Sequence, residues 1–86
     1  MIIIRLLGGA KKVVGKPVVN LDRPYASVSD ILDFLTTISA KPHLMQRSNL
    51  IITLNDVDSA SLHGHDTVVK SGDTVTIVPV VHGGTD

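Results

Sequence analysis

The sequence contains no cysteine, which excludes disulfides, thiolate metal sites and a cysteine nucleophile. Aromatic residues are almost absent as well, with Tyr25 and Phe34 the two examples, so we expect a core of valine, isoleucine and leucine. The formal net charge is zero. Because nucleic-acid binding relies on a basic surface and often on stacking aromatics, we expect no direct contact with nucleic acid.

Long hydrophobic runs are missing too. The apolar stretches are far shorter than the ~20 residues that cross a bilayer, and Met1 leads directly into Ile2 without a basic segment. We therefore expect no signal peptide, no membrane contact and a cytoplasmic location. The 86 residues provide for one small domain, and 43% hydrophobic with 19% charged residues is ordinary for a globular chain.

The first twenty residues predict a hairpin. Residues 1–7 alternate in a way typical of a strand, and the glycines of residues 8–10 indicate a turn. A second strand is predicted over residues 13–21, interrupted near Pro17. Because proline cannot donate a hydrogen bond to a ladder, this strand should lie at the edge of the sheet.

One helix is predicted after this hairpin. Ser27 is suited to cap its first turn, and Asp30, three residues later, completes a capping box. Pro42 should end the helix, since the residue before proline avoids the helical conformation. The buried stripe is expected from apolar residues at helical spacing, with Phe34 at its edge: Val28, Ile31, Leu32, Leu35 and Ile38.

The second half predicts further strands. Residues 49–54 and 73–78 have strand patterns, and Asn55-Asp56 is a turn signal. Between them we expect a short strand or irregular link over residues 57–62 and a polar connection over residues 63–72. The order predicts a small α+β fold in which one helix covers a mixed sheet of four to five strands and forms the crossover to a parallel strand.

The chain ends with two glycines, Gly83 and Gly84, close to its terminus. One interpretation is an inert, frayed end, because most domains have one. The other is a working tail, since glycine lets backbone approach reacting groups closely in a narrow site. With no cysteine in the chain, any sulfur it carried would have to sit on a C-terminal carbonyl.

The last quarter of the chain resembles the MoaD/ThiS family, which includes the ubiquitin-related modifiers and small archaeal modifier proteins. Residues 71–79 followed by Val81-His82-Gly83-Gly84 are similar to the family ending D-G-D-x-V-x-I-x-P-x-V-x-G-G. Residues 54–56 resemble its V-N-G turn, with Asp56 in place of glycine. The joint spacing of strand, proline and diglycine favours a working tail over a frayed one.

This resemblance implies a ubiquitin-like β-grasp domain over residues 1–79 and a flexible diglycine tail over residues 80–86. It implies that Val81, His82 and Gly83 bind inside a partner enzyme related to the ubiquitin activators. That enzyme would use ATP to adenylate the carboxylate of Gly84. The chain itself would hold no cofactor and catalyse nothing, and it would then be joined to protein lysines or carry sulfur as a thiocarboxylate.

One departure from the family pattern is that Thr85-Asp86 follow the diglycine. While they remain, Gly84 has no free carboxylate. We expect a protease to cut between Gly84 and Thr85, which favours a protein modifier. The alternatives are an added remnant or a member that has lost the activity.

Other residues allow two interpretations each. The pair His63 and His65 is expected to be solvated loop histidines rather than a metal site, since a site needs three or four converging ligands. A general-base role for His82 is disfavoured because the activating partner would supply catalytic groups. Five lysines are either attachment points or ordinary surface charge: Lys11, Lys12, Lys16, Lys41 and Lys70.

A partner-binding surface is predicted on the sheet face opposite the helix. If the alternation holds, Ile3, Leu7 and Val78 lie there, with Pro79 at its end. Incidental surface exposure is the alternative. The partners to consider are an adenylating enzyme, a processing protease, and target proteins or the large subunit of molybdopterin synthase. Competing functions are a sulfur carrier for molybdopterin or thiazole synthesis, and an interaction module whose glycines are inert.

Overall fold

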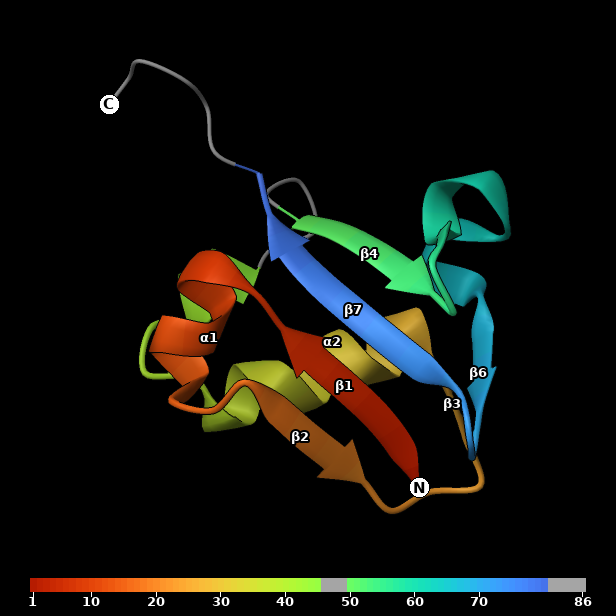
Figure 1. Cartoon of the computed structure of the whole chain (residues 1–86), viewed down its shortest axis with the longest axis horizontal. Helices are drawn as coiled ribbons and strands as arrows, with labels where there is room; N and C mark the ends of the chain where they lie inside the picture. Colours follow the sequence, from red (N-terminus) through yellow and green to blue (C-terminus); the bar gives the residue numbers. More distant parts are fainter. Residues whose placement is uncertain (46–49, 81–86) are drawn as a thin grey trace.

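The computed structural model describes residues 1–45 and 50–80. Its main sheet contains the strands β1 Ile2–Leu6, β2 Val18–Leu21, β4 Leu50–Leu54, β5 Val57–Asp58 and β7 Thr74–Pro79 in the order β2-β1-β7-β4-β5. The strands β1 and β7 run parallel, whereas the other pairs are antiparallel. The predicted mixed sheet is therefore confirmed, and β2 lies at an edge as expected (Figure 1).

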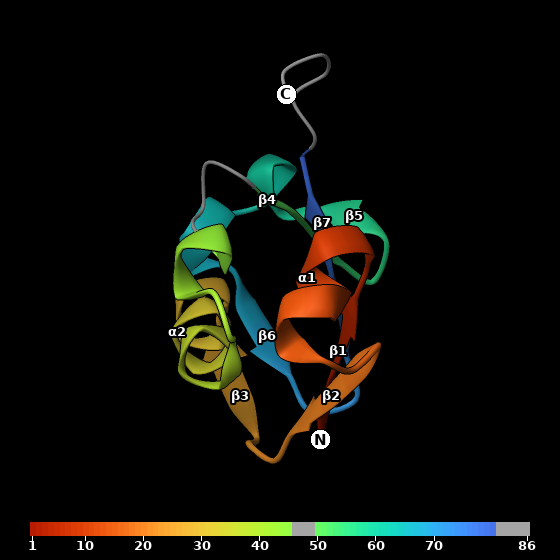
Figure 2. The same ribbon diagram turned by 90° about the vertical axis from the view of Figure 1, so that its left-hand side faces the viewer.

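The helix α2, Val28–Ile38, packs across one face of this sheet, as Figure 2 shows. Its buried side chains are Val28, Ile31, Leu32 and Leu35. Ile38, predicted to belong to the same stripe, is exposed at the last turn. From the sheet, the core receives every second residue of the central strands: Ile2, Ile4, Leu6, Ile52, Val75 and Ile77. The predicted packing of one helix on the inner face is confirmed.

The capping box of α2 is present as predicted. Asp30 N donates to Ser27 Oγ at 3.0 Å, and Ser27 N donates to Asp30 Oδ2 at 3.1 Å. The hydrogen bonds from the backbone and then the side chain of Ser27 lower the pKa of Asp30. Two of the otherwise unpaired groups at the helix start are thereby satisfied.

Residues 8–14 differ from the prediction. In place of a turn leading straight into a strand, the structure has a short helix, α1 Gly8–Val14, which ends at Gly15 in the left-handed conformation. Ala10 is buried on its inner side. The predicted antiparallel pairing of β1 with β2 is present, with α1 as the connection between the two strands. The strand β2 starts at Val18, five residues later than predicted. The dipeptide Gly8-Gly9 disfavours a helix on propensity alone, so its packing against the rest of the chain overrides the local preference.

A second sheet was not predicted. The strand β3, Tyr25–Ser27, pairs with β6, Val68–Lys70, so part of the expected polar connection over residues 63–72 is a strand. Ala26 and Val69 are buried in this pair, and Val69 points into the core. A three-residue strand with one buried side chain is too short for its alternation of buried and exposed residues to be recognised in the sequence. Three 3-10 turns complete the described chain: η1 Pro42–Met45, η3 Ser59–Ser61 and η4 Gly64–Asp66.

The turn at Asn55-Asp56 has positive φ at both residues, +49° and +70°, which suits a two-residue hairpin. The Asn55 side chain donates to Asp73 Oδ1 at 3.1 Å and accepts from Thr74 N at 2.9 Å. Asp73 Oδ2 accepts from Lys70 N at 2.8 Å. The backbone hydrogen bond from Lys70 and then the amide of Asn55 lower the pKa of Asp73. This carboxylate therefore joins two turns at the same end of the sheet.

Replacing Asp73 with asparagine is expected to reduce stability at pH 7 by up to ~1 kcal/mol, because the carboxylate is largely exposed. A carboxyl whose pKa is lowered by folding stabilises the protein above its unfolded pKa, and this contribution disappears as the pH falls through the folded pKa. The difference between wild type and Asp73→Asn should thus close below about pH 4. Urea unfolding at pH 7 and pH 3 measures it, and an unchanged difference at pH 3 would refute the assignment.

Candidate functional site

The end of β7 carries the C-terminal segment out of the fold. This strand lies between β1 and β4, and its residues Val75 and Ile77 are fully buried. Leu7 N donates to Ile77 O at 3.1 Å, and this hydrogen bond connects the start of α1 to the C-terminal part of β7. The point where the chain leaves the sheet is consequently held on both sides by hydrogen-bonded strands.

Pro79 ends this strand opposite Leu50. Pro79 is the last residue of β7. A proline is tolerated there because no further ladder follows it in the described chain, which continues with the exposed Val80. The predicted tail residues Val81, His82, Gly83, Gly84 and Thr85 lie outside the described residues.

The two glycines at the start of α1 lie close to the ring of Pro79. A Cβ built on Gly8 would be 3.9 Å from Pro79 Cδ, and one on Gly9 would be 4.0 Å from Pro79 Cγ. Both are ordinary contacts, so the space itself would tolerate alanine. Gly8, however, has φ +54°, which disfavours any residue with a side chain. Gly8 is thus required by backbone conformation, whereas Gly9 is not.

Gly8→Ala is expected to lower the free energy of unfolding by about 1–2 kcal/mol, the cost of a left-handed conformation for an L-residue. Gly9→Ala is the matched control, since it has no positive φ and alanine favours helix over glycine. We expect it to be neutral or stabilising. Thermal and urea unfolding of the two variants measures this contrast, and equal losses would contradict it.

The residues predicted to form a partner surface lie on the outer face of the main sheet. Ile3 and Leu7 are exposed by 38% and 41%, and they lie on the face of the sheet opposite α2, because Ile2, Ile4 and Leu6 between and beside them are buried. Val78 shares that face but is only half-buried, as is Pro79 beyond it. Leu7, Val78 and Pro79 therefore lie near the point where the chain leaves the sheet, whereas Ile3 lies on the same face at the opposite end of β7, where it pairs with Thr74.

Two further apolar residues of this face were missed. They are Ile51, which pairs with Val78, and Val18, which pairs with Arg5. The side chains of Ile51 and Val18 are exposed. We define the outer-face patch as Ile3, Leu7, Val18, Ile51 and Val78. The alternation of residues 50–54 could have identified Ile51, since Ile52 next to it is buried. Val18 was not assigned to a face, because the predicted strand was interrupted near Pro17 and the observed strand begins directly after it.

The histidines and acidic residues of the described chain do not gather into a candidate metal centre. His63 is exposed, His65 is half-buried, and no group of three or more potential metal ligands occurs within residues 1–45 and 50–80. The lysines at 11, 12, 16, 41 and 70 are all exposed. Within the same ranges, none of the helices is long and apolar enough to cross a bilayer. The features that remain for a candidate site are the end of β7 and the apolar outer face beside it.

Comparison with known proteins decides the family. The family model described as "ThiS family" matches residues 4–84, which is nearly the whole chain. The chain belongs to the ThiS family. It is related through this family to ubiquitin-like modifiers and sulfur carriers, which are small carrier proteins rather than catalysts.

Individual relatives agree with this membership. A 35-residue segment is 46% identical to a ubiquitin-related modifier 1 homolog of Caenorhabditis elegans, covering 41% of this chain and 35% of that protein. The fold matches a chain of the BexX/CysO complex of Amycolatopsis orientalis with TM-score 0.74 and 26% identity, covering 98% of this ThiS-family chain and 100% of that chain.

A third match concerns the fold alone. The small archaeal modifier protein 1 of Methanosarcina acetivorans superimposes with TM-score 0.79 at 23% identity, over 96% of this chain and 95% of that one. The predicted ubiquitin-like β-grasp fold is confirmed by these structural matches. The chain spans only about a third of the curated relative it matches in sequence.

Proposed function

We propose that this ThiS-family protein is a ubiquitin-like modifier whose Gly84 carboxylate is adenylated by a partner enzyme after removal of Thr85-Asp86. The observation that carries this proposal is that the family match extends to residue 84, the second glycine of the pair, and stops there. The two residues that follow lie beyond the family pattern. The relatives are modifiers and sulfur carriers, which is the class of protein that such a tail would serve.

The chemistry needs only a free carboxylate from this chain. An oxygen of the Gly84 carboxylate attacks the α-phosphorus of ATP, and pyrophosphate leaves. The acyl-adenylate then loses AMP to a nucleophile, which is either a lysine amine of a target protein or a sulfur donor. The first yields an isopeptide and the second a thiocarboxylate. The catalytic groups and the nucleotide belong to the activating enzyme.

The outer-face patch is the surface that such an enzyme would bind. Leu7, Ile51 and Val78 of the patch lie at the end of the sheet where β7 ends, because Leu6 pairs with Ile77 and Ile51 pairs with Val78. An enzyme that covers the patch would receive the residues after Val80 without a further change in the fold. Apolar residues at the centre of an interface typically carry most of its binding energy.

The intact mass of the protein isolated from its own cells tests this proposal. We expect a chain ending at Gly84, and either the corresponding thiocarboxylate or isopeptide-linked products whose linkage ends at Gly84. A thiocarboxylate without conjugates would place the protein among plain sulfur carriers. If every molecule kept Thr85-Asp86, the proposal would be wrong, and an interaction module with inert glycines would remain.

A further inference from the structure

A pocket on the other face of the sheet is not part of the site described above. It has a volume of about 220 Å³ and is lined by residues of β4, β5, η3 and η4: Leu50, Ile52, Asp58, Ser59, Ala60, Gly64 and His65. Ile52 faces the core, whereas Ile51 next to it belongs to the outer-face patch. The pocket therefore opens on the α2 side of the sheet, and its occupation would not obstruct that patch.

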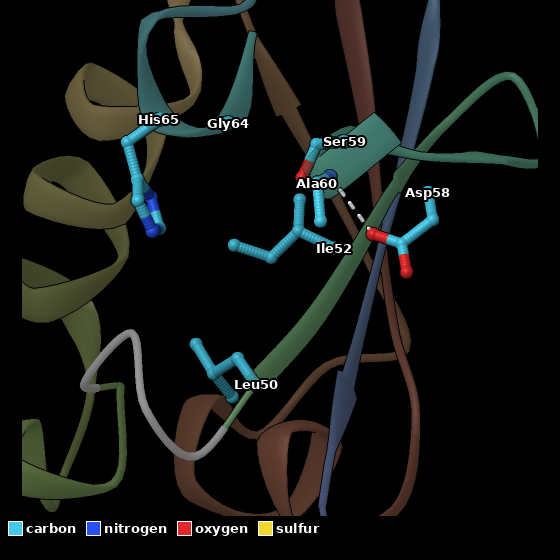
Figure 3. A pocket seen from close by; sticks show the side chains of 7 residues that line it. All are labelled: Leu50, Ile52, Asp58, Ser59, Ala60, Gly64 and His65. Carbon is cyan, nitrogen blue, oxygen red and sulfur yellow. Dashed lines mark hydrogen bonds between the residues drawn. The ribbon is translucent and has the colours of Figure 1, made fainter. Parts of the chain in front are cut away.

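The lining combines an apolar wall with two polar groups. Figure 3 shows Leu50 and Ile52 extending from β4 toward the imidazole of His65. Ser59 and Ala60 border the pocket beside Ile52. Ser59 is buried as a residue. The Asp58 carboxylate is engaged elsewhere, because Oδ1 accepts from Ala60 N at 3.0 Å.

His65 carries the observation that points to a ligand. Its Nδ1 is buried and has no hydrogen-bond partner within the described chain. Buried polar atoms are normally paired, so an unpaired one is an exception that requires a reason. The imidazole that carries this atom also lines the pocket (Figure 3). A hydroxyl group there would pair with either tautomer, since it both donates and accepts.

We propose that this pocket binds a tyrosine side chain of a partner protein. Its volume is smaller than the ~300–1,000 Å³ of cofactor and drug sites, and it exceeds the ~30 Å³ share of a single water several-fold. An aromatic ring covers the wall formed by Leu50, Ile52 and Ala60. The phenolic hydroxyl pairs with the imidazole of His65. Tyrosine is also among the residues that most often anchor protein interfaces.

The proposal does not depend on the tail. Gly64, which precedes His65 in η4, has φ +58°, a backbone conformation that favours glycine. The partner that supplies the tyrosine would contact the α2 side while the activating enzyme contacts the outer-face patch. The two contacts could thus be made at the same time.

Titration of the full 86-residue chain with N-acetyl-tyrosinamide, followed by amide NMR, tests the pocket. We expect saturable shifts confined to residues 50–66. N-acetyl-phenylalaninamide, which lacks only the hydroxyl, should bind at least about threefold more weakly, because one net hydrogen bond is worth about that factor. Equal binding of the two amides would overturn the proposal, as would tighter binding of N-acetyl-argininamide through Asp58.

Two variants and one control complete the test. Ala60→Leu, at an exposed position, should fill the pocket and abolish binding of both amides. His65→Phe should bring the tyrosine amide down to the affinity of the phenylalanine amide. Ile51→Ser, on the opposite face of β4, should change neither. Binding that survives Ala60→Leu would refute the site, and binding of p-cresol without the tyrosine amide would show a site for free phenols instead of a protein side chain.

Discussion

A chain that ends at Gly84 is expected to be adenylated when it is incubated with the activating enzyme of its host and ATP, whereas the chain of 86 residues is not. The reason is the position of the nucleophile. Only a free carboxylate can attack the α-phosphorus, and in the longer chain the carbon of Gly84 is held in an amide. Its terminal carboxylate belongs to Asp86, two residues farther along and behind residues with side chains.

Intact mass measures this result directly, as the addition of one adenylyl group. In the chain that ends at residue 84, Gly84→Ala should slow adenylation by ~100-fold, because misplacement of a reacting group by about 1 Å costs that much. Gly9→Ala is a suitable control, since this substitution leaves the tail intact. Equal adenylation of the 84- and 86-residue chains would show that Thr85-Asp86 do not regulate the tail.

Ile4→Ala is expected to lower the free energy of unfolding by about 3 kcal/mol, within the usual 2–5 kcal/mol for large-to-small changes in a core. Ile4 is completely buried between β2 and β7, where it contributes to the layer that packs on α2. A domain of this size is only marginally stable, so such a loss would leave a large fraction unfolded at physiological temperature. Urea unfolding followed by circular dichroism measures it.

Ile3→Ala is the matched control. It lies next to Ile4 on the same strand, it is 38% exposed, and it loses the same preference of isoleucine for strands. We expect a loss below about 1 kcal/mol, so the difference between the two variants reports burial alone. Losses of the same size would contradict the assignment of faces.

The same position also tests the outer-face patch. Ile3→Asp should leave the fold intact and slow adenylation by ~10-fold, since a charge would be buried against the enzyme without a partner. An unchanged rate would exclude Ile3 from the docking surface. Arg5, on the same face, provides a variant of similar exposure, Arg5→Gln, that should have a smaller effect.

Much of the fold was accessible from sequence because it depends on strong local patterns. The alternation of residues 1–7, the capping box of Ser27 and Asp30, and the turn at Asn55-Asp56 each involve neighbours a few residues apart. For the same reason, the inner and outer faces of β1 could be assigned before any coordinates. The motif that ends at Gly84 identified the family for a different reason, namely that strand, proline and diglycine occur at a fixed spacing.

Other features depend on contacts between distant residues. The helix α1 contradicts the local preference of Gly8 and Gly9 and exists because Ala10 is buried and Pro79 packs against its first turn. The strands β3 and β6, 41 or more residues apart, are too short to be recognised alone and are defined only by pairing with each other. The pocket beneath His65 requires β4 and two 3-10 turns to meet.

The sequence by itself therefore determined the sheet's central strands, the one long helix, the apolar outer face and the diglycine end, because each is encoded by residues close together in the chain. Tertiary structure alone decided the second sheet, the short first helix and the pocket at His65. Their free energy comes from burial against segments tens of residues away, and no local pattern carries that information.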